Sequence, residues 1–400
     1  MIKLKTDYDY LIIGAGIMGL TVGFELHKKH PEKKIAIIEK EHDVAMHASG
    51  RNSGVLHAGF YYSANSMKAR HSVEGNRLMK EFCTEHNIPI NNCQKVVVAC
   101  NEEELTTLYE LESRGKNNGV ELSLIDEVEL AKIEPNAKTF KKALFSPTTA
   151  SVDPIEVCQK LKKILTTKGI DFYFDTKYIR RESDGVVTNN GNFKAGFVIN
   201  AAGLYADVIA RDYGYSKDWV IIPFKGIYLK YTGGEKLIGT NIYPVPNLLN
   251  PFLGVHYTVT AHNHIKIGPT SIPAFWRENY KGFSGFKVRE FLQIISYEFR
   301  LFLFNSFNFR QLAISEVKKY KRKYFTGLAE RLTKSMDTKL FNEWLEPGIR
   351  AQLLNKNTYK LEMDFIVEGD DKSLHLLNAV SPAFTCSFSM AKYLVNERII

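Results

Sequence analysis

The stretch Tyr8-Asp-Tyr-Leu-Ile-Ile-Gly-Ala-Gly-Ile-Met-Gly19 decides the fold of this chain. Its first six residues form a short apolar run typical of a buried β-strand, and residues 16–30 follow with the pattern of an α-helix. Residues 34–39 (Lys-Ile-Ala-Ile-Ile-Glu) predict a second strand. The three segments therefore predict one βαβ unit at the start of an α/β fold.

The turn inside this unit has the pattern G-x-G-x-x-G. Gly14 allows a tight turn, Gly16 leaves room for a pyrophosphate, and Gly19 lets the helix approach the strand closely. The N–H groups of Ile17 and Met18 open the helix, where they can bind phosphate oxygens. The context of strand, turn and helix makes a dinucleotide site the preferred interpretation over an unliganded glycine turn.

An acidic residue stands where such a site needs one. Glu39 ends the second strand, followed by Lys40, and a carboxylate at that position holds the ribose hydroxyls of a dinucleotide. It would repel a 2′-phosphate, so NADP is disfavoured. The motif alone leaves FAD and NAD open.

Length and composition limit the other possibilities. The chain has 400 residues, which predicts two domains, and a formal net charge of +9, which favours an anionic partner. The five cysteines are irregularly spaced without a CxxC pair, so we expect reduced thiols and neither a disulfide framework nor a metal site. No run is long and apolar enough for a membrane-spanning helix.

The rest of the chain alternates strands and helices. We expect a long functional loop, a second largely antiparallel sheet, and a helical region before a closing strand, strand and helix. The corresponding ranges are 42–62 for the loop, 66–87 and 102–117 for helices, 94–100 and 170–200 for strands, 219–270 for the second sheet and 286–345 for the helical region. Asp153-Pro154 is expected to open a further helix.

Several blocks of the sequence resemble one enzyme family in the family's own order. The segment His47-Ala-Ser-Gly-Arg-Asn-Ser-Gly-Val-Leu-His-Ala-Gly-Phe-Tyr-Tyr62 resembles the flavin-contacting segment of L-2-hydroxyglutarate oxidases and dehydrogenases, members of the D-amino-acid-oxidase-like FAD superfamily. Further matching blocks are 200–207, 223–226, 241–246, 348–352 and 378–383. The resemblance implies FAD as the cofactor and oxidation of an L-2-hydroxy acid, first of all L-2-hydroxyglutarate, by hydride transfer to flavin N5.

The resemblance also implies an architecture. We expect a Rossmann-type FAD-binding domain interleaved with an α+β substrate domain built on a mixed or antiparallel sheet. The FAD-binding domain is expected to comprise 1–90, 145–215 and 345–400. The substrate domain is expected to comprise 91–144 and 216–344, with a helical insert at about 283–340.

The expected chemistry needs a base and a carboxylate clamp. His57 is the first candidate for the base and His256 the second, because an imidazole with a pKa near 6.5 suits proton abstraction at neutral pH. A structural role, or for His57 a bond to the flavin, is the alternative. Arg350 is the best candidate for binding the α-carboxylate through two parallel N–H bonds. Lys225 could hold a second carboxylate, and Tyr243 could donate a hydrogen bond.

Other residues are expected to contact the cofactor, mainly through the resemblance. They lie in the loop after the βαβ unit, at the end of a later strand that Gly203 is expected to close, near the last strands and at the start of the final helix. The residues are Ser49, Asn52, Ser53, Gly54, Ala202, Gly203, Gly348, Pro382, Ala383, Phe384 and Thr385. The N-terminus of the final helix can stabilise a negatively charged reduced flavin.

Departures from the family pattern leave the substrate open. Lys225 stands where the family usually has Arg, and residues 272–340 diverge most. An amine or amino-acid oxidase of the same superfamily is therefore the enzymatic alternative. A non-catalytic, membrane-associated FAD-binding protein is the alternative from another class.

Residues 283–323 suggest a peripheral membrane contact. They mix many phenylalanines with basic residues and end on Lys318-Lys-Tyr-Lys-Arg-Lys323. An amphipathic helix with a basic flank can lie on an anionic membrane; a helix packed in the core is the alternative. We expect a cytoplasmic protein that associates with the inner face of the membrane, with oxygen or the quinone pool as electron acceptor and no nucleic-acid partner.

Overall fold

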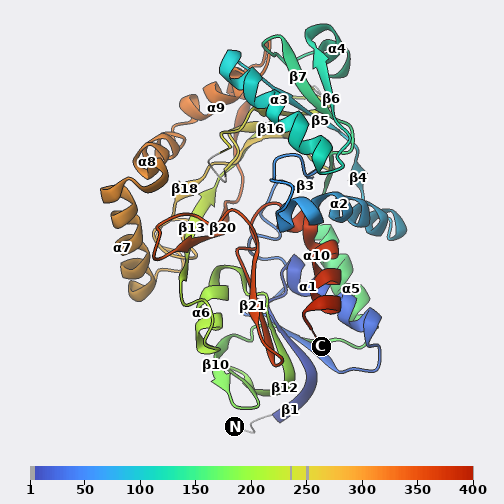
Figure 1. Cartoon of the computed structure of the whole chain (residues 1–400), viewed down its shortest axis with the longest axis vertical. Coiled ribbons are helices and arrows are strands. Elements are labelled where there is room, and N and C mark those ends of the chain that lie inside the picture. The colour runs from blue at the N-terminus through green and yellow to red at the C-terminus, as the bar shows by residue number, and fades with distance from the viewer. Residues whose placement is uncertain (1–4, 235–236, 249–251, 400) are drawn as a thin grey trace. The chain divides into compact units, whose positions relative to one another are not determined.

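The computed structural model describes residues 5–234, 237–248 and 252–399, and these form two compact units (Figure 1). The first unit comprises the described residues of 1–52, 154–223 and 350–400. The second comprises those of 53–153 and 224–349. The chain therefore passes between the units four times, and the units are interleaved in sequence as the resemblance implied.

The first unit is built on an eight-stranded sheet. Its path is β10-β11-β12-β1-β2-β9, with β22 also paired to β12 and β21 to β22. Strands β12, β1, β2, β9 and β22 run parallel, as in a Rossmann-type fold. The strands are β1 (Lys5–Ile13), β2 (Ile35–Ile38), β9 (Asp171–Tyr173), β10 (Tyr178–Glu182), β11 (Gly185–Thr188), β12 (Gly191–Asn200), β21 (Ile366–Gly369) and β22 (Ser373–Leu377).

Helices cover this sheet. Helix α1 packs against α10 and α5, and α6 packs against β10, β12 and β22 (Figure 1). The helices are α1 (Ile17–Lys29), α5 (Pro154–Thr167), the 3₁₀ turn η1 (Gly203–Tyr205), α6 (Ala206–Asp212) and α10 (Ala383–Glu397). The predicted βαβ unit is thus confirmed, and Pro154 begins α5 as expected.

The second unit is built on a mixed eight-stranded sheet of order β19-β14-β17-β16-β15-β5-β7-β6. Among its described strands, β15 and β5 run parallel, and the other neighbouring pairs run antiparallel. The strands are β5 (Lys95–Val98), β6 (Ser123–Asp126), β7 (Lys142–Ser146), β14 (Leu229–Tyr231), β15 (Asn241–Pro244), β16 (His256–Val259), β17 (Ile265–Gly268) and β19 (Phe341–Trp344). The expectation of a mixed or antiparallel sheet is confirmed.

Helices and two small sheets complete the second unit. The helices are α2 (Met67–Glu85), α3 (Glu102–Asn117), α4 (Glu127–Ile133), α7 (Val288–Phe304), η2 (Ser306–Asn308), α8 (Phe309–Lys318), α9 (Arg322–Glu330) and η3 (Thr338–Leu340). One small sheet joins β3 (Val55–Leu56), β8 (Ala150–Val152) and β4 (Ile90–Asn91). Another joins β18 (Ile272–Pro273), β13 (Trp219–Gly226) and β20 (Gly348–Asn355), and the chain passes between the units within β13 and β20.

The observed division of the chain differs from the expected one. We expected 53–90 and 145–153 in the same domain as the glycine turn, but the structure groups them with the second unit. The cause is packing against the large sheet: Phe60 and Tyr61 share a hydrophobic core with Val97 of β5, and Asn91 Nδ2 donates to Thr260 O at 2.9 Å. Residues 150–152 follow because β3 and β4 both pair with β8. Residues 345–349 also belong to the second unit, where Leu345 N donates to Tyr228 O. Residues 216–223 belong to the first, where Ser216 N donates to Glu368.

The helical region expected over 286–345 ends earlier. It forms α7, α8 and α9 with short 3₁₀ turns, but residues 341–344 form strand β19. This strand pairs with β14, so backbone pairing in the large sheet outweighs the local helical pattern. Among the described residues, no helix combines the length and the hydropathy needed to cross a membrane.

Candidate functional site

The glycine turn after β1 is closed by backbone contacts that leave no room for side chains. A Cβ on Gly14, where φ is +107°, would lie 2.7 Å from the carbonyl oxygen of Ala201. A Cβ on Gly19 would lie 2.0 Å from the oxygen of Gly14. These distances are far below van der Waals contact, so the strand, turn and helix can approach this closely only with glycine. The turn has the form that a pyrophosphate-binding motif requires.

Gly16 has a different neighbour from the one expected. A Cβ there would lie 2.9 Å from Ser49 Oγ, and the same hydroxyl accepts a hydrogen bond from Ile17 N at 2.9 Å. Ser49 thereby caps the first turn of α1 from the loop that follows β2. Asn52 lies in the same loop, and its amide donates to the oxygens of Ala48 and Ser49. The structure thus brings Ser49 to the glycine turn.

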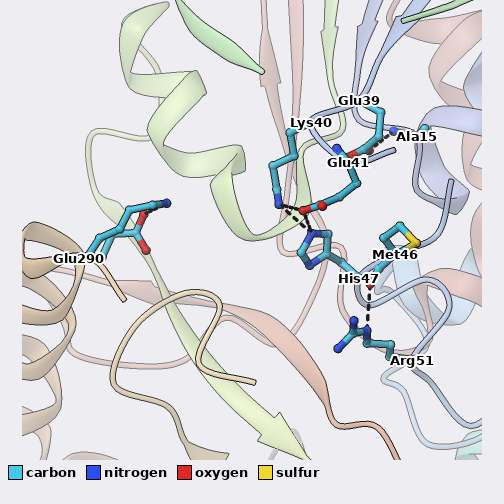
Figure 2. Close-up of polar contacts among 9 residues, drawn as sticks. Ala15, Glu39, Lys40, Glu41, Met46, His47, Arg51 and Glu290 are labelled. Atoms are coloured by element: carbon cyan, nitrogen blue, oxygen red, sulfur yellow. Dashed lines mark hydrogen bonds and ion pairs between the residues drawn. The ribbon is translucent and has the colours of Figure 1, made fainter. Parts of the chain in front are cut away.

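Glu39 follows β2 and faces the glycine turn. Its carboxylate accepts a hydrogen bond from Ala15 N at 2.8 Å and another from Glu41 N at 3.0 Å (Figure 2). The acid is therefore held beside the turn by backbone N–H groups. This position suits a carboxylate that binds ribose hydroxyls, and together with the glycines it fits a dinucleotide such as FAD.

Lys40 belongs to a charged cluster that the sequence did not indicate. Its Nζ contacts Glu41 and lies 2.8 Å from His47 Nε2, which is itself 2.8 Å from Glu41 Oε1 (Figure 2). Burial would raise the pKa of Glu41, but the bonds from Lys40 and His47 outweigh it and lower this pKa to about 2. Nearby, Arg51 Nε donates to the oxygen of Met46 at 2.9 Å. The cluster ties the strand end to the following loop.

Two further groups of residues that we expected to contact the cofactor lie in the first unit. Strand β12 ends at Asn200, whose side chain accepts from Ala202 N at 3.2 Å, and Gly203 then begins the turn η1 with φ of +53°. We expected Gly203 to end the strand, but it follows the strand and begins the turn instead. Pro382 is the N-cap of α10 and provides no side-chain hydrogen bond to the first turn, which contains Ala383, Phe384 and Thr385. The predicted start of this helix is confirmed.

Ser53, Gly54, His57 and Gly348 belong to the second unit, in contrast to the expected domain division. His57 is buried and follows β3, where its carbonyl oxygen accepts from Asn76 Nδ2 at 3.2 Å. Burial, then the charges of Lys95 and His256, place the pKa of the His57 imidazole well below its ordinary value. The imidazole is therefore neutral at physiological pH, as a proton acceptor must be.

His256 and Tyr243 form a stacked pair in the large sheet of the second unit. Their ring centroids are 3.6 Å apart with an interplanar angle of 16°. His256 Nδ1 lies 2.8 Å from the carbonyl oxygen of Gly254, an acceptor, so Nδ1 carries a proton. Both residues are buried. The structure thus couples His57, His256 and Tyr243 within one unit, three of the five residues expected to act on substrate.

The other two expected residues are placed separately. Lys225 lies in β13 within the second unit, it is 8% exposed, and burial lowers the pKa of its ammonium. Arg350 lies in β20 within the first unit and is partly buried. An arginine and a buried lysine are both suited to carboxylates, Arg as a bidentate donor and Lys as a point charge.

Sequence reasoning missed one buried residue, Lys95. It opens β5, it is 0% exposed, and its ammonium lies 4.2 Å from the centroid of the Tyr243 ring. A signal was present, because Lys95 begins the otherwise apolar run Lys-Val-Val-Val of a strand with buried residues throughout. A charged side chain in such a strand is rarely without a function.

Comparison with known proteins agrees with this geometry. The family described as FAD dependent oxidoreductase matches residues 9–396. The L-2-hydroxyglutarate dehydrogenase of Indibacter alkaliphilus is 35% identical over 406 residues, covering 96% of this chain and 97% of that protein. The mitochondrial L-2-hydroxyglutarate dehydrogenase of Bos taurus is 33% identical, covering 98% and 89%. The L-2-hydroxyglutarate dehydrogenase of Escherichia coli K12 is 30% identical, covering 98% and 93%.

Solved structures share the fold. The FAD-bound L-α-glycerophosphate oxidase of Mycoplasma pneumoniae superposes with a TM-score of 0.76 at 21% identity, covering 98% of this chain and 94% of that one. The L-proline dehydrogenase of P. horikoshii superposes with a TM-score of 0.71 at 18% identity, covering 99% and 95%. At such identities the likeness concerns the fold alone. Taken with the full-length relatives, it shows that the chain belongs to the FAD dependent oxidoreductase family and, within it, to the L-2-hydroxyglutarate dehydrogenase group.

Proposed function

We propose that this chain oxidises L-2-hydroxyglutarate, or a closely similar L-2-hydroxy acid, to the corresponding 2-oxo acid. The observation that carries the proposal is the match over nearly the whole chain, at 30–35% identity, to proteins named L-2-hydroxyglutarate dehydrogenase. A buried cluster of the second unit supports it. This cluster consists of two imidazoles, a phenol and an ammonium group, from His57, His256, Tyr243 and Lys95. Such a set favours an anionic substrate over a cationic amine.

FAD would be held by the glycine turn, Glu39 and Ser49, with Asn52, Gly203 and the start of α10 as further contacts, and when bound it supplies the hydride acceptor. Ser53, Gly54 and Gly348 are further proposed contacts of the cofactor, because their segments resemble those of the family. Backbone N–H groups at the start of α1 suit the phosphates, and the Glu39 carboxylate suits the ribose.

The reaction also requires removal of the hydroxyl proton, and His57 is the proposed acceptor. Its buried imidazole is neutral because burial and two neighbouring charges lower its pKa. A neutral imidazole can accept a proton at physiological pH, and the activity should persist to below pH ~6.5 on the acid side. His256, whose Nδ1 donates to Gly254, is the second candidate and would present Nε2.

Binding of the substrate carboxylates is assigned to Arg350 and Lys225. The guanidinium of Arg350 can form two parallel bonds to the α-carboxylate. Lys225 would provide a point charge for the second carboxylate. Burial lowers the pKa of its ammonium, and a bound carboxylate would oppose this effect by favouring the charged form. Tyr243 would orient the substrate through its hydroxyl.

Anaerobic reduction of the FAD-loaded protein tests this proposal. Loss of the flavin's visible absorbance would be followed on adding L-2-hydroxyglutarate, its D-isomer, other hydroxy acids and amino acids. Rapid bleaching by the L-hydroxy acid alone is expected. Bleaching by an amino acid or amine would replace the substrate assignment with that of an amine or amino-acid oxidase. Retention of the colour with every compound would overturn the catalytic proposal.

We infer in addition that α7 and α8 contact an anionic membrane surface from the cytoplasmic side. Exposed apolar side chains along these helices support this inference: Leu292, Phe299, Phe302, Leu303, Phe304, Ile314 and Val317. Phe299, Phe302 and Val317 also line an apolar groove of about 650 Å³. Two expected members do not contribute, because Phe309 is buried and Lys319 is buried against Glu316. The remaining cations, such as Lys318, Lys321 and Lys323, are exposed and suit anionic lipids.

This surface would bring the reduced enzyme to the quinone pool, with oxygen as the alternative acceptor. Co-sedimentation with vesicles tests the contact. Binding to vesicles containing phosphatidylglycerol but not to pure phosphatidylcholine is expected, and F299S with F304S should weaken it. Tyr109→Ser, an exposed aromatic on α3, is the matched control. Equal binding by both variants would contradict the inference.

A further inference from the structure

The apolar groove of the second unit lies between helices α7 and α8, which pack against each other (Figure 1). Its lining residues recur every three or four positions along each helix, so each helix turns one face toward the groove. They are Ile295, Phe299 and Phe302 on α7 and Phe309, Ala313 and Val317 on α8. The volume of about 650 Å³ falls within the range of roughly 300–1,000 Å³ that is usual for small-molecule sites. The groove can therefore hold a small apolar molecule.

Glu298 is an acid within this apolar lining. It lies on α7 between Ile294 and Leu301, at the spacing of the buried face of that helix, and it is only 5% exposed. Among the described residues, no hydrogen-bond partner is found for its Oε1. Burial raises the pKa of this carboxyl well above its ordinary value. The protonated form is therefore favoured, and it can donate a hydrogen bond.

The other polar side chains of the lining are either paired within the protein or open to solvent. Asn279 Nδ2 donates to the oxygen of Gly282 at 3.1 Å, and Ser296 Oγ donates to the oxygen of Gln293 at 2.8 Å. Tyr320 is 50% exposed, so water can reach its side chain. A buried polar group without a partner destabilises a fold, and an apolar side chain in place of the acid would avoid this cost. The unpartnered acid therefore points to a hydrogen-bonding ligand in the groove.

We propose that this groove binds the head group of a membrane quinone, with the Glu298 carboxyl donating a hydrogen bond to a quinone carbonyl oxygen. The assignment rests on the proposed function, in which the reduced enzyme needs an electron acceptor. A quinone head group is a flat conjugated ring that packs well on aromatic side chains, and its carbonyl oxygens accept hydrogen bonds. The groove provides both kinds of contact, because aromatic residues line it beside the acid: Phe275, Phe299, Phe302, Phe309 and Tyr320.

The position of the groove favours a ligand that arrives from a bilayer. Phe299 and Phe302 line the groove and are 64% and 44% exposed, so the lining continues into the surface proposed to contact the membrane. A quinone dissolves among acyl chains and would reach the groove through this surface. A water-soluble acceptor would need several polar partners, which this lining lacks. The acyl chain of a phospholipid would fill the apolar part but would leave Glu298 without a partner.

Calorimetric titration of the FAD-loaded protein with a ubiquinone that carries a single isoprene unit, and with the corresponding menaquinone, tests the site without turnover. Binding of at least one of the two is expected. Glu298→Met should weaken this binding about tenfold, the size of one lost hydrogen bond, whereas Glu298→Gln keeps a donor and should bind as the wild type does. The melting temperature of Glu298→Met should equal or exceed that of the wild type, because an unpartnered buried acid has been removed. Equal affinity of Glu298→Met and the wild type would overturn the role of the acid.

Substitutions on α8 locate the bound quinone. Ala313→Trp should fill the groove and abolish binding, and Ile314→Trp is the matched control, since Ile314 is exposed on the same helix and does not line the groove. Phe304→Ser should weaken vesicle binding and leave the affinity for the quinone unchanged, because Phe304 is exposed outside the groove. Equal binding by the two tryptophan variants would overturn the location.

Two further outcomes would overturn the assignment of the groove. One is the absence of binding of either quinone to the wild type. The other is a dimer in solution that dissociates in Ala313→Trp, which would give the groove to a second copy of the chain. Failure of every hydroxy acid to bleach the flavin would instead overturn the proposed function, and the titration with quinones distinguishes the two failures because it requires no turnover.

Discussion

The glycine turn of the first unit and the buried cluster of the second unit differ in how their polar groups are paired. In the turn, polar groups are paired within the protein: Glu39 with Ala15 N and Glu41 N, and Ser49 with Ile17 N. In the cluster, the Lys95 ammonium and the Tyr61 hydroxyl have no hydrogen-bond partner among the described residues. The turn is built mainly from backbone, whereas the cluster is built from side chains.

The difference shows how the two kinds of binding relate to stability. A cradle for phosphate and ribose can be assembled from amides that also hold the fold together, so damage to it costs both stability and cofactor. A cluster with unmatched charge costs stability in the absence of its ligand and is retained for function. Substitutions in the buried cluster should therefore change turnover while the flavin stays bound. Substitutions in the glycine turn should change flavin binding.

The largest expected effect is that of His57→Asn. Removing the proposed base should lower the rate of flavin reduction by L-2-hydroxyglutarate about 10³-fold, within the range for general-base catalysis. The flavin content should be unchanged, because the buried cluster and not the glycine turn has been altered. Stopped-flow anaerobic reduction measures the first quantity and the absorbance ratio of flavin to protein the second.

The control for this substitution is His264→Asn, an exposed histidine in the same unit. It should leave both quantities unchanged. A His57→Asn variant that reduces at the wild-type rate would remove His57 from the chemistry and leave His256 as the candidate base. A variant without flavin would show that the cluster supports cofactor binding, and the contrast between the two regions would fail.

The second effect is on stability, from Gly19→Ala. The added Cβ would lie 2.0 Å from the oxygen of Gly14, a backbone atom that cannot move aside. We expect a loss of about 3 kcal/mol, the upper end for overpacking, and loss of bound flavin. Gly327→Ala in α9 is the matched control, since its Cβ meets nothing within 4 Å and alanine is favoured in a helix. Thermal melts that show equal behaviour of both variants would contradict the tight turn.

The turn was predictable from sequence and the cluster was not, for a physical reason. Gly14, Gly16, Gly19 and Glu39 lie within one βαβ unit, so local spacing alone brings them together. The cluster joins Lys95, Tyr243 and His256 through strand pairing across the large sheet, while His57 follows β3 of a different sheet. Spacing along the chain carries no information on that pairing. The resemblance to a known family supplied His57 and His256. Lys95 was missed although it begins an apolar run, because that run does not show which groups surround the lysine in the fold.

Domain boundaries were missed for the same reason. The short strands β3, β4 and β8 contain two or three residues each and pair with one another, and packing of Phe60 and Tyr61 with Val97 places 53–90 in the second unit. Strands this short give no periodicity to read. Helices, by contrast, carry their own signals: α3 was expected at 102–117 and is observed at Glu102–Asn117, with Asn101 as a side-chain N-cap.

The third effect is on cofactor affinity, from Glu39→Gln. The amide keeps the shape of the side chain but lacks the charge that strengthens its bonds to donors. We expect FAD to bind about tenfold more weakly, near the lower end for a hydrogen bond to a charged group. Titration of the apoprotein with FAD, followed by flavin fluorescence, measures the affinity. Glu32→Gln, an exposed acid between α1 and β2, should have no effect, and equal affinity of the two variants would remove Glu39 from the site.

The smallest expected effect is that of Glu41→Gln on the free energy of unfolding, and its size depends on pH. The pKa of Glu41 is lowered from 4.5 to about 2 by Lys40 and His47, against the opposing effect of burial. Because the pKa of this carboxyl group is lower in the folded state than in the unfolded state, its charge stabilises the protein at pH values above 4.5. This contribution is lost as the pH falls from 4.5 through the folded-state pKa of about 2. Because the pair is partly exposed, we expect only about 1 kcal/mol at pH 7.

Urea unfolding of the FAD-loaded wild type and Glu41→Gln at a series of pH values from 7 down to 3 measures this contribution. The difference in the free energy of unfolding should shrink steadily as the pH falls below 4.5, the ordinary value of this carboxyl group. Glu32→Gln corrects for general charge effects. A difference as large at pH 3 as at pH 7 would assign the role of Glu41 to packing and not to its charge. In that case the loop after β2 would be held by shape, and the polar pairing that distinguishes the first unit from the buried cluster would be limited to Glu39 and Ser49.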